Sequence, residues 1–556
     1  MGHSRVRIGK TEEGRTVLEI LQAQGEYIPA PCGGNGSCGK CRVRLSGTAP
    51  APSQTEQSVL TEQELSDGIR LACLTDAFEG MEVEILPENE KDMEVETAFS
   101  LGSIGTHSAG TGTGIGTGIG TGTGDSSAPG TEKSGTGASS PASAAPGSLQ
   151  ANDSAKDSPG DSMKDSSKDS SKDSTEDSIA AAVDIGTTTI ALSAVNTGSK
   201  EILGTATGIN HQRAWGADVI SRMEASNQGK GEQLRKSILE DLEHLLAELG
   251  LSADTPMVIS GNTTMEHLLQ GYSCRTLGVA PYKPVDISLH EYENMTILPG
   301  ISTFVGADIV SGIVACGMDR SEEICILVDL GTNGEMAIGN RDRIISASTA
   351  AGPAFEGGNI SCGVAGIPGA VRSVEITDGK AVTQTIGNLP PAGLCGTGVL
   401  ETIYELLKEE LVDETGLLDD EYFEEGFPIA DGIVFTAKDV REVQLAKSAV
   451  RAGLEVLLQE YGVEYDRIGK LYIAGGFGQK INLEKAVGIG LLPEELLDRM
   501  IPVGNSSLAG AVMAACDPEI LERMRAVGEK AEETSLAENP LFSELYMDHM
   551  FFPEQE

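Results

Sequence analysis

The sequence has no run of apolar residues near the roughly 20 that a helix needs to span a bilayer. Its first ten residues, MGHSRVRIGK, lack the apolar stretch of a secretion signal. Val6 stands where the Met-Gly myristoylation pattern requires Ser or Thr. We therefore expect a cytoplasmic protein without a membrane partner.

Basic residues are also scarce, since 40 Lys and Arg stand against 84 Asp and Glu and give a formal net charge of −44. A surface this acidic repels phosphate backbones, so we expect no nucleic-acid partner. The 556 residues nevertheless leave room for three or four domains with buried cores.

Apolar residues are too few between about residues 100 and 178 to form a core. This stretch runs from GTGTGIGTGIGTGTG through a Ser/Ala/Pro-rich part to an Asp-Ser pair at every fourth residue from Asp153 to Asp177. We interpret 96–178 as a low-complexity, flexible (disordered) linker that reaches on the order of 50 Å. It separates a small domain, 1–95, from a large one, 179–550.

Both flanking parts show the patterns of a multi-domain α/β protein. In the first, VRI and MEVEIL predict strands, and TVLEILQAQG and LTEQELSDG predict helices. In the second, AAVDIG, ICILVDLG and KLYIAGGFG predict apolar strands. The amphipathic stretch 232–250 predicts a helix that ends at Gly250.

Four of the ten cysteines form one constellation. Cys32, Cys38 and Cys41 have the spacing C-x5-C-x2-C within CGGNGSCGKC, and Cys73 follows after 31 further residues. The glycines of this loop allow its N–H groups to turn toward a cofactor and stabilise negative charge on sulfur. The other six cysteines stand alone, and we interpret them as small buried apolar residues.

A [2Fe–2S] cluster fits this spacing best, because it takes three ligands from one compact loop and a distant fourth. Structural zinc remains an alternative, although zinc sites usually combine two C-x2–4-C pairs. Disulfides suit an unsecreted chain poorly. The same loop matches G-x-x-x-x-G-K, but Cys41 follows where a phosphate-binding loop has Ser or Thr for Mg²⁺.

Two segments of the large part repeat one design. VDIGTTTIAL (183–192) and VDLGTNGEMAI (328–338) each place Asp-x-Gly-Thr after an apolar strand. The Gly allows a tight turn in which N–H and hydroxyl groups surround an anion. The Asp can hold Mg²⁺ through water or orient an attacking water. IAGGFG (473–478) adds a glycine pair against which a nucleotide can lie.

The first domain resembles the [2Fe–2S] ferredoxin domain with the β-grasp fold, with Cys32, Cys38, Cys41 and Cys73 as cluster ligands. The large part resembles the superfamily of acetate and sugar kinases, Hsp70 and actin, whose two ribonuclease-H-like lobes bind ATP between them. A Rossmann-type oxidoreductase is the alternative, but no G-x-G-x-x-G follows the first strand.

The kinase-type resemblance implies an ATP site with two catalytic aspartates, Asp184 and Asp329. It implies that the first phosphate loop contains Thr187 and Thr188. The implied second phosphate loop contains Gly331, Thr332 and Asn333, and the implied adenosine site contains Gly475 and Gly476.

Together with the ferredoxin part, four further stretches resemble the reductive activators of corrinoid proteins. These stretches are 210–223, 260–271, 304–317 and 348–363. This resemblance implies ATP-dependent reduction of Co(II) corrinoid to Co(I), with one electron passing from a low-potential donor through the cluster. It implies a corrinoid protein as partner and leaves a homodimer open. Members of the family commonly carry a small folded domain where this chain has the low-complexity linker.

Two residue sets and three functions remain open on the sequence alone. His211, Arg213 and Trp215 form either a binding surface or a buried anchor. The loop 348–363 either approaches the corrinoid or connects the lobes. The alternative functions are an ATP-driven electron injector for a dehydratase or reductase, a small-molecule kinase with an accessory cluster, and a non-enzymatic scaffold.

Overall fold

The computed structural model describes residues 5–9, 14–24, 28, 30, 36, 39–46, 50–86, 178–476 and 480–554. The expected linker lies outside these residues apart from Ser178. Cys32 and Cys38 also lie outside them, as do the last two residues of IAGGFG.

The N-terminal part contains a four-stranded sheet with the strand order β1-β4-β2-β3. Its core is aliphatic, with Val17, Ile20, Leu71 and Val83 fully buried. The predicted helices and strands are present within a few residues of their expected limits. The elements are β1 (Arg5–Arg7), α1 (Val17–Ala23), β2 (Arg42–Ser46), α2 (Gln54–Val59), α3 (Glu62–Ser66), β3 (Ile69–Leu71) and β4 (Glu82–Ile85).

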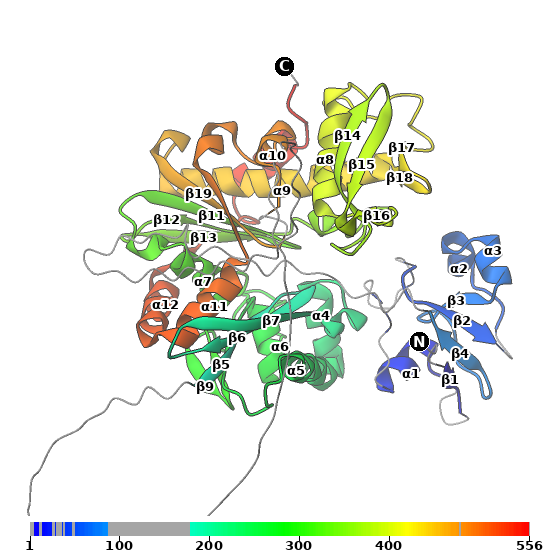
Figure 1. Ribbon diagram of the computed structural model, residues 1–556, viewed down its shortest axis with the longest axis horizontal. Coiled ribbons are helices and arrows are strands. Elements are labelled where there is room, and N and C mark those ends of the chain that lie inside the picture. The colour runs from blue at the N-terminus through cyan, green and yellow to red at the C-terminus, as the bar shows by residue number, and fades with distance from the viewer. Residues whose placement is uncertain are drawn as a thin grey trace, which may run out of the picture. The chain divides into compact units, whose positions relative to one another are not determined.

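The large part contains two six-stranded sheets of matching design. Their strand orders are β7-β6-β5-β8-β10-β9 and β20-β19-β11-β12-β13-β21. In each sheet three successive antiparallel strands are joined by two later strands that run parallel to the first. This repeated arrangement is the two-lobed ribonuclease-H-like fold that the resemblance implied, and Figure 1 shows the two sheets one above the other.

The first lobe comprises β5 (Ile179–Ile185), β6 (Thr189–Asn196), β7 (Glu201–Ile209), η4 (His211–Ala214), α4 (Val219–Ala225), η5 (Ser226–Lys230), α5 (Gly231–Glu248), β8 (Met257–Gly261), α6 (Thr263–Gln270), β9 (His290–Tyr292), β10 (Met295–Ile297) and α7 (Ala307–Ala315). Helix α5 covers the outer face of this sheet with the apolar stripe that the sequence predicted, of which Leu234, Ile238 and Leu242 are buried. Gly250 follows this helix with φ +70°.

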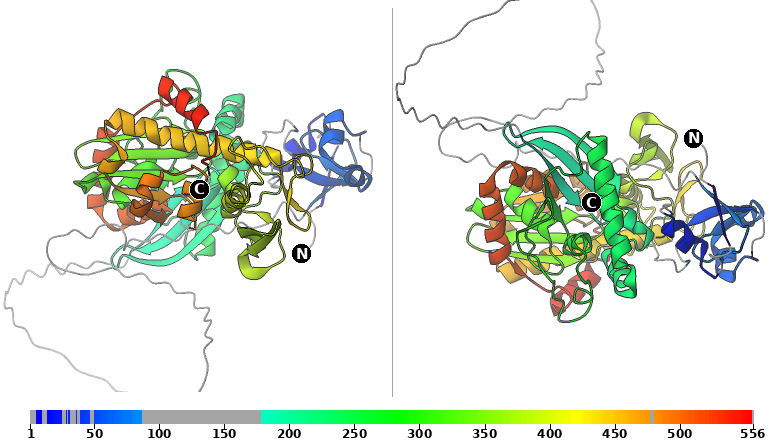
Figure 2. Two further views of the ribbon diagram at one scale, coloured as in Figure 1. Left: turned by 90° about the horizontal axis from the view of Figure 1, so that it is seen from above. Right: turned by 90° about the horizontal axis from the view of Figure 1, so that it is seen from below.

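The second lobe comprises η6 (Met318–Arg320), β11 (Ile324–Leu330), β12 (Gly334–Gly339), β13 (Ile344–Thr349), η7 (Ala354–Glu356), β14 (Ala370–Thr377), β15 (Lys380–Thr385), η8 (Ile386–Asn388), β16 (Gly393–Leu394), α8 (Gly396–Lys408), β17 (Phe427–Ala430), β18 (Ile433–Phe435), α9 (Ala437–Tyr461), η9 (Tyr465–Arg467), β19 (Ile468–Ala474), α10 (Leu483–Gly488), η10 (Glu494–Arg499), β20 (Met500–Gly504), α11 (Ser506–Cys516), α12 (Pro518–Lys530), β21 (Glu532–Glu533) and α13 (Pro540–Asp548). Helix α9 is the long helix across its outer face (Figure 2).

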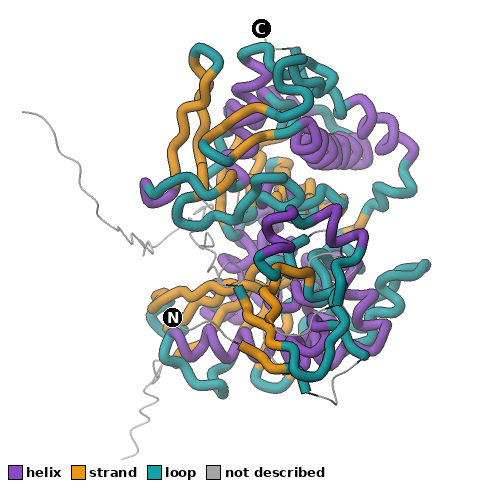
Figure 3. Tube along the Cα trace, turned by 90° about the vertical axis from the view of Figure 1, so that its right-hand side faces the viewer, coloured by secondary structure: helices purple, strands orange, loops and turns teal. Residues whose placement is uncertain are grey.

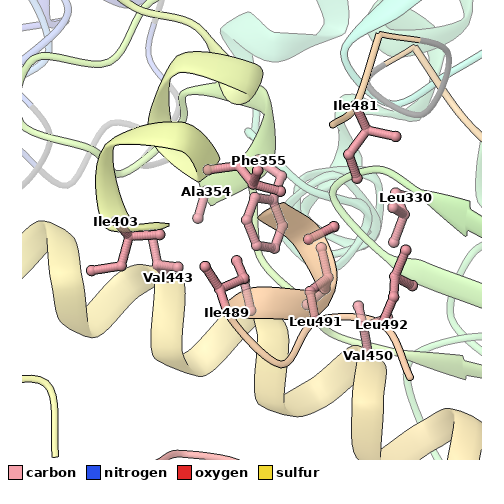
Figure 4. Close-up of a cluster of buried hydrophobic side chains, with 14 of the residues drawn as sticks. Leu330, Ala354, Phe355, Ile403, Val443, Val450, Ile481, Ile489, Leu491 and Leu492 are labelled. Carbon is pink, nitrogen blue, oxygen red and sulfur yellow. The ribbon is translucent and has the colours of Figure 1, made fainter. Parts of the chain in front are cut away.

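An insertion of small sheets stands between β13 and α9. Strands β14, β15 and β16 form one sheet and β17 and β18 form another. In Figure 3 the long β14–β15 ribbon projects at the top of the molecule. Phe355 of η7 and Ile403 of α8, both between β13 and α9, share one core with Ile489, which follows α9 (Figure 4).

Helices α7 and α11 meet between the two sheets (Figure 1). A side chain at Gly510 of α11 has no room, because a Cβ there would lie 2.5 Å from the Cβ of Ser311 on α7. The helices therefore approach each other closely at this point. None of the helices in the described parts of the chain is long and apolar enough to cross a membrane.

Candidate functional site

The two Asp-x-Gly-Thr segments form the first hairpin of each lobe. Strand β5 pairs with β6 and β11 pairs with β12, both antiparallel, and the predicted phosphate loops are the turns between them. Asp184 and Asp329 each lie next to the last residue of their strand, so they occupy equivalent places in the two lobes. Their carboxyl groups are near enough that the charge of Asp184 raises the pKa of Asp329.

The glycines in and beside these turns differ in how much room a side chain would have. A Cβ at Gly186 would lie 2.7 Å from the backbone oxygen of Thr189, so this turn requires glycine. Gly331 has only ordinary contacts around its missing side chain. Gly475 has φ +94°, and a Cβ there would lie 2.9 Å from Oδ1 of Asp329. Gly476 has no neighbour within 4 Å of that position, as a surface for a nucleotide would require.

Asp184 is held by the first residues of helix α11. The amide of Asn505 donates to Oδ2 of Asp184 at 2.8 Å, and the hydroxyl of Ser507 donates to Oδ1 at 2.7 Å. The Ser507 hydroxyl is also 2.9 Å from the hydroxyl of Ser260, which is 3.0 Å from that of Ser311. These buried hydroxyls connect the aspartate with both crossing helices.

Several further carboxyl groups surround the two aspartates. Burial, together with the charges of Asp308, Asp184 and Glu356, raises the pKa of Asp329 to about 8. Burial, with a smaller contribution from the charge of Asp184, brings the pKa of Asp308 to about 7. Burial and the same neighbours raise the pKa of Glu335 well above its usual range. Without a cation, part of this cluster is therefore protonated at neutral pH.

Burial also raises the pKa of Asp184, although its bonds from Ser507 and Asn505 act in the opposite direction. Glu266 on α6 shows the same effect more strongly, with a smaller contribution from Asp308. Its Oε1 atom is buried and has no hydrogen-bond partner. A buried carboxyl oxygen without a hydrogen-bond partner is stabilised by a proton on the carboxyl group or by a nearby cation.

Glu356 connects the two predicted phosphate loops. Its Oε2 atom accepts the hydroxyl of Thr332 at 2.6 Å and that of Thr188 at 3.5 Å, the limit of a hydrogen bond. Burial raises the pKa of Glu356, whereas the Thr332 hydrogen bond and the charge of Arg213 lower it. Each loop thus places one threonine hydroxyl toward the same point.

The remaining loop residues have local partners. Thr187 is buried, and its hydroxyl accepts the side-chain amide of Asn262, the cap of helix α6, at 3.1 Å. The side chain of Asn333 bonds to Glu335 and lowers the pKa of that carboxyl. Neither residue is thereby excluded from binding a phosphate, and their assignment to the nucleotide stays a prediction.

The donors present fit Mg²⁺ carried by a nucleotide. No group of three or more His, Cys, Asp or Glu side chains among the described residues is arranged to hold a metal ion by itself. Mg²⁺ usually keeps several waters and is bound through one or two carboxylates and the phosphates of its nucleotide. Asp184 and Asp329 suit that role, because each lies directly before the turn that forms a predicted phosphate loop.

Cys41 and Cys73 are together in the N-terminal part. Their Sγ atoms are 3.3 Å apart, beyond the about 2.05 Å of a disulfide. Two thiolates that each lie about 2.3 Å from one tetrahedral metal stand roughly 3.8 Å apart, so a small movement suffices for both to bind one iron or zinc ion. The backbone N–H of Ala72 donates to the carbonyl of Cys41 at 2.8 Å and joins the two ligand segments. Cys32 and Cys38 stay predicted ligands.

Of the three residues singled out near position 213, two have structural contacts and one lies near the carboxyl cluster. Nδ1 of His211 is 2.5 Å from Oδ1 of Asp241, and Trp215 is half-buried against the first-lobe core. Arg213 is near enough to Glu356 for its charge to lower the pKa of that carboxyl. The structure thus brings Arg213, but not the other two, toward the carboxyl cluster.

Sequence reasoning missed several residues of this cleft. Asn262, Asp308 and Glu356 lie in stretches that were noted for their resemblance to corrinoid activators, but were not singled out. The stretch GNSSLAG, which contains Asn505 and Ser507, carried no signal. These two become functional candidates only through their contact with Asp184 across more than 300 residues.

Comparison with known proteins covers both parts of the chain. Residues 4–77 match the model of the 2Fe–2S iron–sulfur cluster binding domain, which confirms the ferredoxin-type domain. Residues 179–321 match the RACo middle region, and residues 323–556 match the C-terminal domain of RACo, the ASKHA domain. These two matches correspond to the two lobes.

Two curated proteins and one solved structure are similar over most of the chain. The corrinoid activation enzyme RamQ of Eubacterium limosum is 33% identical, over 67% of this chain and 70% of that protein. The [Co(II) methylated amine-specific corrinoid protein] reductase of Methanosarcina barkeri is 26% identical, over 66% of this chain and 75% of that protein. A reductive activator for corrinoid, iron–sulfur protein has a TM-score of 0.64 at 25% identity, over 99% of this chain and 96% of that one.

Proposed function

This chain belongs to the family of RACo-type corrinoid activation enzymes, and on that premise we propose how its residues carry out the activity. The enzyme reduces the Co(II) corrinoid of a partner protein to Co(I) with the help of ATP. The observation that carries this conclusion is the union, in one chain, of a ferredoxin-type domain with adjacent thiols and a two-lobed cleft with paired aspartates.

The [2Fe–2S] cluster supplies one-electron transfer at low potential. Cys41 and Cys73 would hold one of its irons, together with Cys32 and Cys38 on the other. The glycine-rich loop that carries three of these ligands would provide N–H donors, which would stabilise negative charge on the sulfur atoms and so tune the potential. We propose a low-potential protein as the electron donor.

The ATP site would use Asp184 and Asp329 as the carboxylates that face Mg²⁺ and the attacking water. Thr187, Thr188, Thr332 and Asn333 would bind phosphate oxygens, and Gly475 and Gly476 would lie against the adenosine. Because reduction to Co(I) is unfavourable, ATP must change the relative free energies of two states of the complex. The carboxyl cluster is where the charge of Mg²⁺–ATP would act, because a nearby cation would lower the pKa values of these carboxyl groups.

Two finer points complete the proposal. We expect the enzyme to act in the cytoplasm, where ATP and reduced donors are available. The proposal leaves open whether the enzyme is a monomer or a homodimer, and light scattering of the purified chain would distinguish the two.

The decisive experiment is anaerobic EPR of the dithionite-reduced enzyme mixed with a Co(II) corrinoid protein from the same organism, with and without MgATP. We expect a [2Fe–2S] signal and a Co(II) signal that decays further when MgATP is present. A cluster signal with a Co(II) signal that ignores MgATP would instead favour an electron injector for another acceptor. A phosphorylated small molecule formed without reductant would favour a kinase.

A further inference from the structure

Glu356 stands where the two predicted phosphate loops converge. It ends the short turn η7, outside both Asp-x-Gly-Thr segments, yet its Oε2 atom accepts hydroxyl hydrogens from both loops, at 2.6 Å from Thr332 and 3.5 Å from Thr188. No other carboxyl oxygen among the described residues has hydrogen bonds to threonines of both loops. The contact therefore spans the cleft at one atom.

The chemistry of this contact matches that of a bound phosphate. A carboxylate oxygen and a phosphate oxygen are both anionic acceptors of hydroxyl hydrogens. Thr188 and Thr332 are the hydroxyls from which the two loops would bind a phosphate. Two anions within about 4 Å repel each other strongly where water is partly excluded. Glu356 and a terminal phosphate thus compete for one position.

We propose that Glu356 is a positioning residue that occupies the place of the terminal phosphate of ATP in the nucleotide-free enzyme and is displaced by that phosphate. This inference rests on the proposed ATP site and adds a device by which the site distinguishes ATP from ADP. Because ADP ends one phosphate earlier, it leaves Glu356 between the two threonines.

The surroundings restrict how Glu356 can leave. Ala354 and Phe355 of the same turn are buried in the second-lobe core, where Figure 4 shows them beside Ile403 and Ile489. The next residue, Gly357, has φ +77°, and a Cβ there would lie 2.3 Å from the carbonyl oxygen of Val364. The backbone of the turn is therefore fixed, so exchange occurs by rotation of the Glu356 side chain.

A displaced carboxylate would remain near positive charge. Arg213 of the first lobe is near enough to lower the pKa of Glu356. It offers the displaced carboxylate a partner on the opposite lobe, so binding of the terminal phosphate would exchange one contact between the lobes for another. The lobes would therefore be linked differently in the ATP and ADP states.

Calorimetry on the full-length enzyme with Mg²⁺ tests the inference, using ADP and the non-hydrolysable analogue ADPNP. We expect Glu356→Ala to bind ADPNP about tenfold more tightly than the wild type, since a competing anion is removed, and to bind ADP within twofold. Glu356→Gln, which keeps the size and an acceptor, should show the same difference to a smaller extent. Glu424→Gln, an exposed carboxylate of the same lobe, serves as the matched control.

Three outcomes would overturn the inference. Equal changes in ADP and ADPNP affinity would indicate a structural role only. Weaker ADPNP binding in both variants would mean that Glu356 assists the phosphate. Unchanged affinities combined with a kcat for ATP hydrolysis reduced at least a hundredfold would mark Glu356 as the group that activates water. If the wild type bound neither nucleotide, the proposed ATP site itself would be wrong, which separates the two failures.

Discussion

Ser507 donates a hydrogen bond of 2.7 Å to Asp184, although more than 300 residues separate the two in the chain. Asp184 is the residue before the end of β5 in the first-lobe sheet, and Ser507 lies in the first turn of α11, which follows β20 of the second-lobe sheet and packs against β5 and β8. Asn505, the cap of the same helix, holds the other carboxylate oxygen at 2.8 Å. The first aspartate of the site is thus oriented by a C-terminal helix that packs on its own sheet.

Loss of this orientation should impair ATP hydrolysis. A hydrogen bond to a charged group contributes about 1.5–3 kcal/mol, so we expect Ser507→Ala to lower kcat/KM for ATP roughly 10- to 100-fold. The neighbouring Ser506 is the matched control, because its buried hydroxyl has no hydrogen-bond partner, and Ser506→Ala should stay within about twofold. Equal rates in the two variants would show that the contact with Asp184 does not matter.

The adjacent thiols of Cys41 and Cys73 give a prediction about the [2Fe–2S] cluster. Cys73→Ser should lose the visible absorption and the EPR signal of the [2Fe–2S] cluster, because a hydroxyl replaces one of two adjacent thiol ligands. Its ATP hydrolysis without a partner should be unchanged, since the nucleotide site lies in the other domain. Cys516→Ala, at a cysteine outside the predicted ligand set, should keep the full signal. A Cys73→Ser enzyme with wild-type absorption would remove Cys73 from that set.

A buried ion pair supports the segment that carries Cys73. Arg70 and Glu56 have side chains only 5% and 0% exposed, and they are 2.7 Å apart. Burial alone would raise the pKa of Glu56, but hydrogen bonds from Arg70, Ser53 and Leu71 lower it. Arg70→Leu would leave this carboxylate buried and unpaired, at a cost of about 3–5 kcal/mol.

The midpoint of guanidinium-induced loss of cluster absorption, measured on the full-length enzyme, reports this destabilisation. Arg44→Met is the control, because Arg44 is 46% exposed and 3.7 Å from its partner, Glu84. Such a surface pair contributes about 1 kcal/mol or less. A midpoint for Arg70→Leu no lower than that of Arg44→Met would contradict the importance of the buried pair.

Lys447 predicts a dependence of stability on pH. Its ammonium group is buried on α9 and donates to the carbonyls of His549 and Phe551, at 2.5 and 2.7 Å. Burial, and then the charge of Arg451, lower its pKa from 10.5 to about 7. Between these two values the unfolded chain binds the proton that the folded chain has lost, so the free energy of unfolding should rise with pH.

The rise attributable to Lys447 from pH 7 to pH 9 should be about 2 kcal/mol. Urea denaturation of the wild type and Lys447→Met at both pH values measures it, because the variant lacks the titrating group and should lose that part of the slope. Parallel pH profiles for the two proteins would show that Lys447 keeps its ordinary pKa.

The sequence predicted those parts of the fold whose signal is local and repeated. Each Asp-x-Gly-Thr segment follows an apolar strand, so Asp184 and Asp329 could be recognised as equivalent before the sheets were known. Glu356, Asn505 and Ser507 could not be recognised, because each acts through a partner that is far away in the chain. Neither hydrophobic periodicity nor turn chemistry specifies which side chains face each other across two lobes.

At the predicted [2Fe–2S] site, too, the sequence predicted one part of the structure and missed another. Spacing alone indicated that Cys41 and Cys73 share a cofactor, and the structure places their thiols together. The Arg70–Glu56 pair that supports Cys73 was missed, because an Arg and a Glu 14 residues apart are ordinary surface residues until burial is known.

The close crossing of α7 and α11 has a consequence for how a movement of these helices would reach the aspartates. Because Gly510 leaves no space against Ser311, no side chain at this point can absorb a shift of one helix along the other. A movement of α11 against α7 at this point would therefore involve the backbone of the whole helix. Asn505 and Ser507 stand at the start of α11, so their hydrogen bonds would carry such a movement to the carboxylate of Asp184.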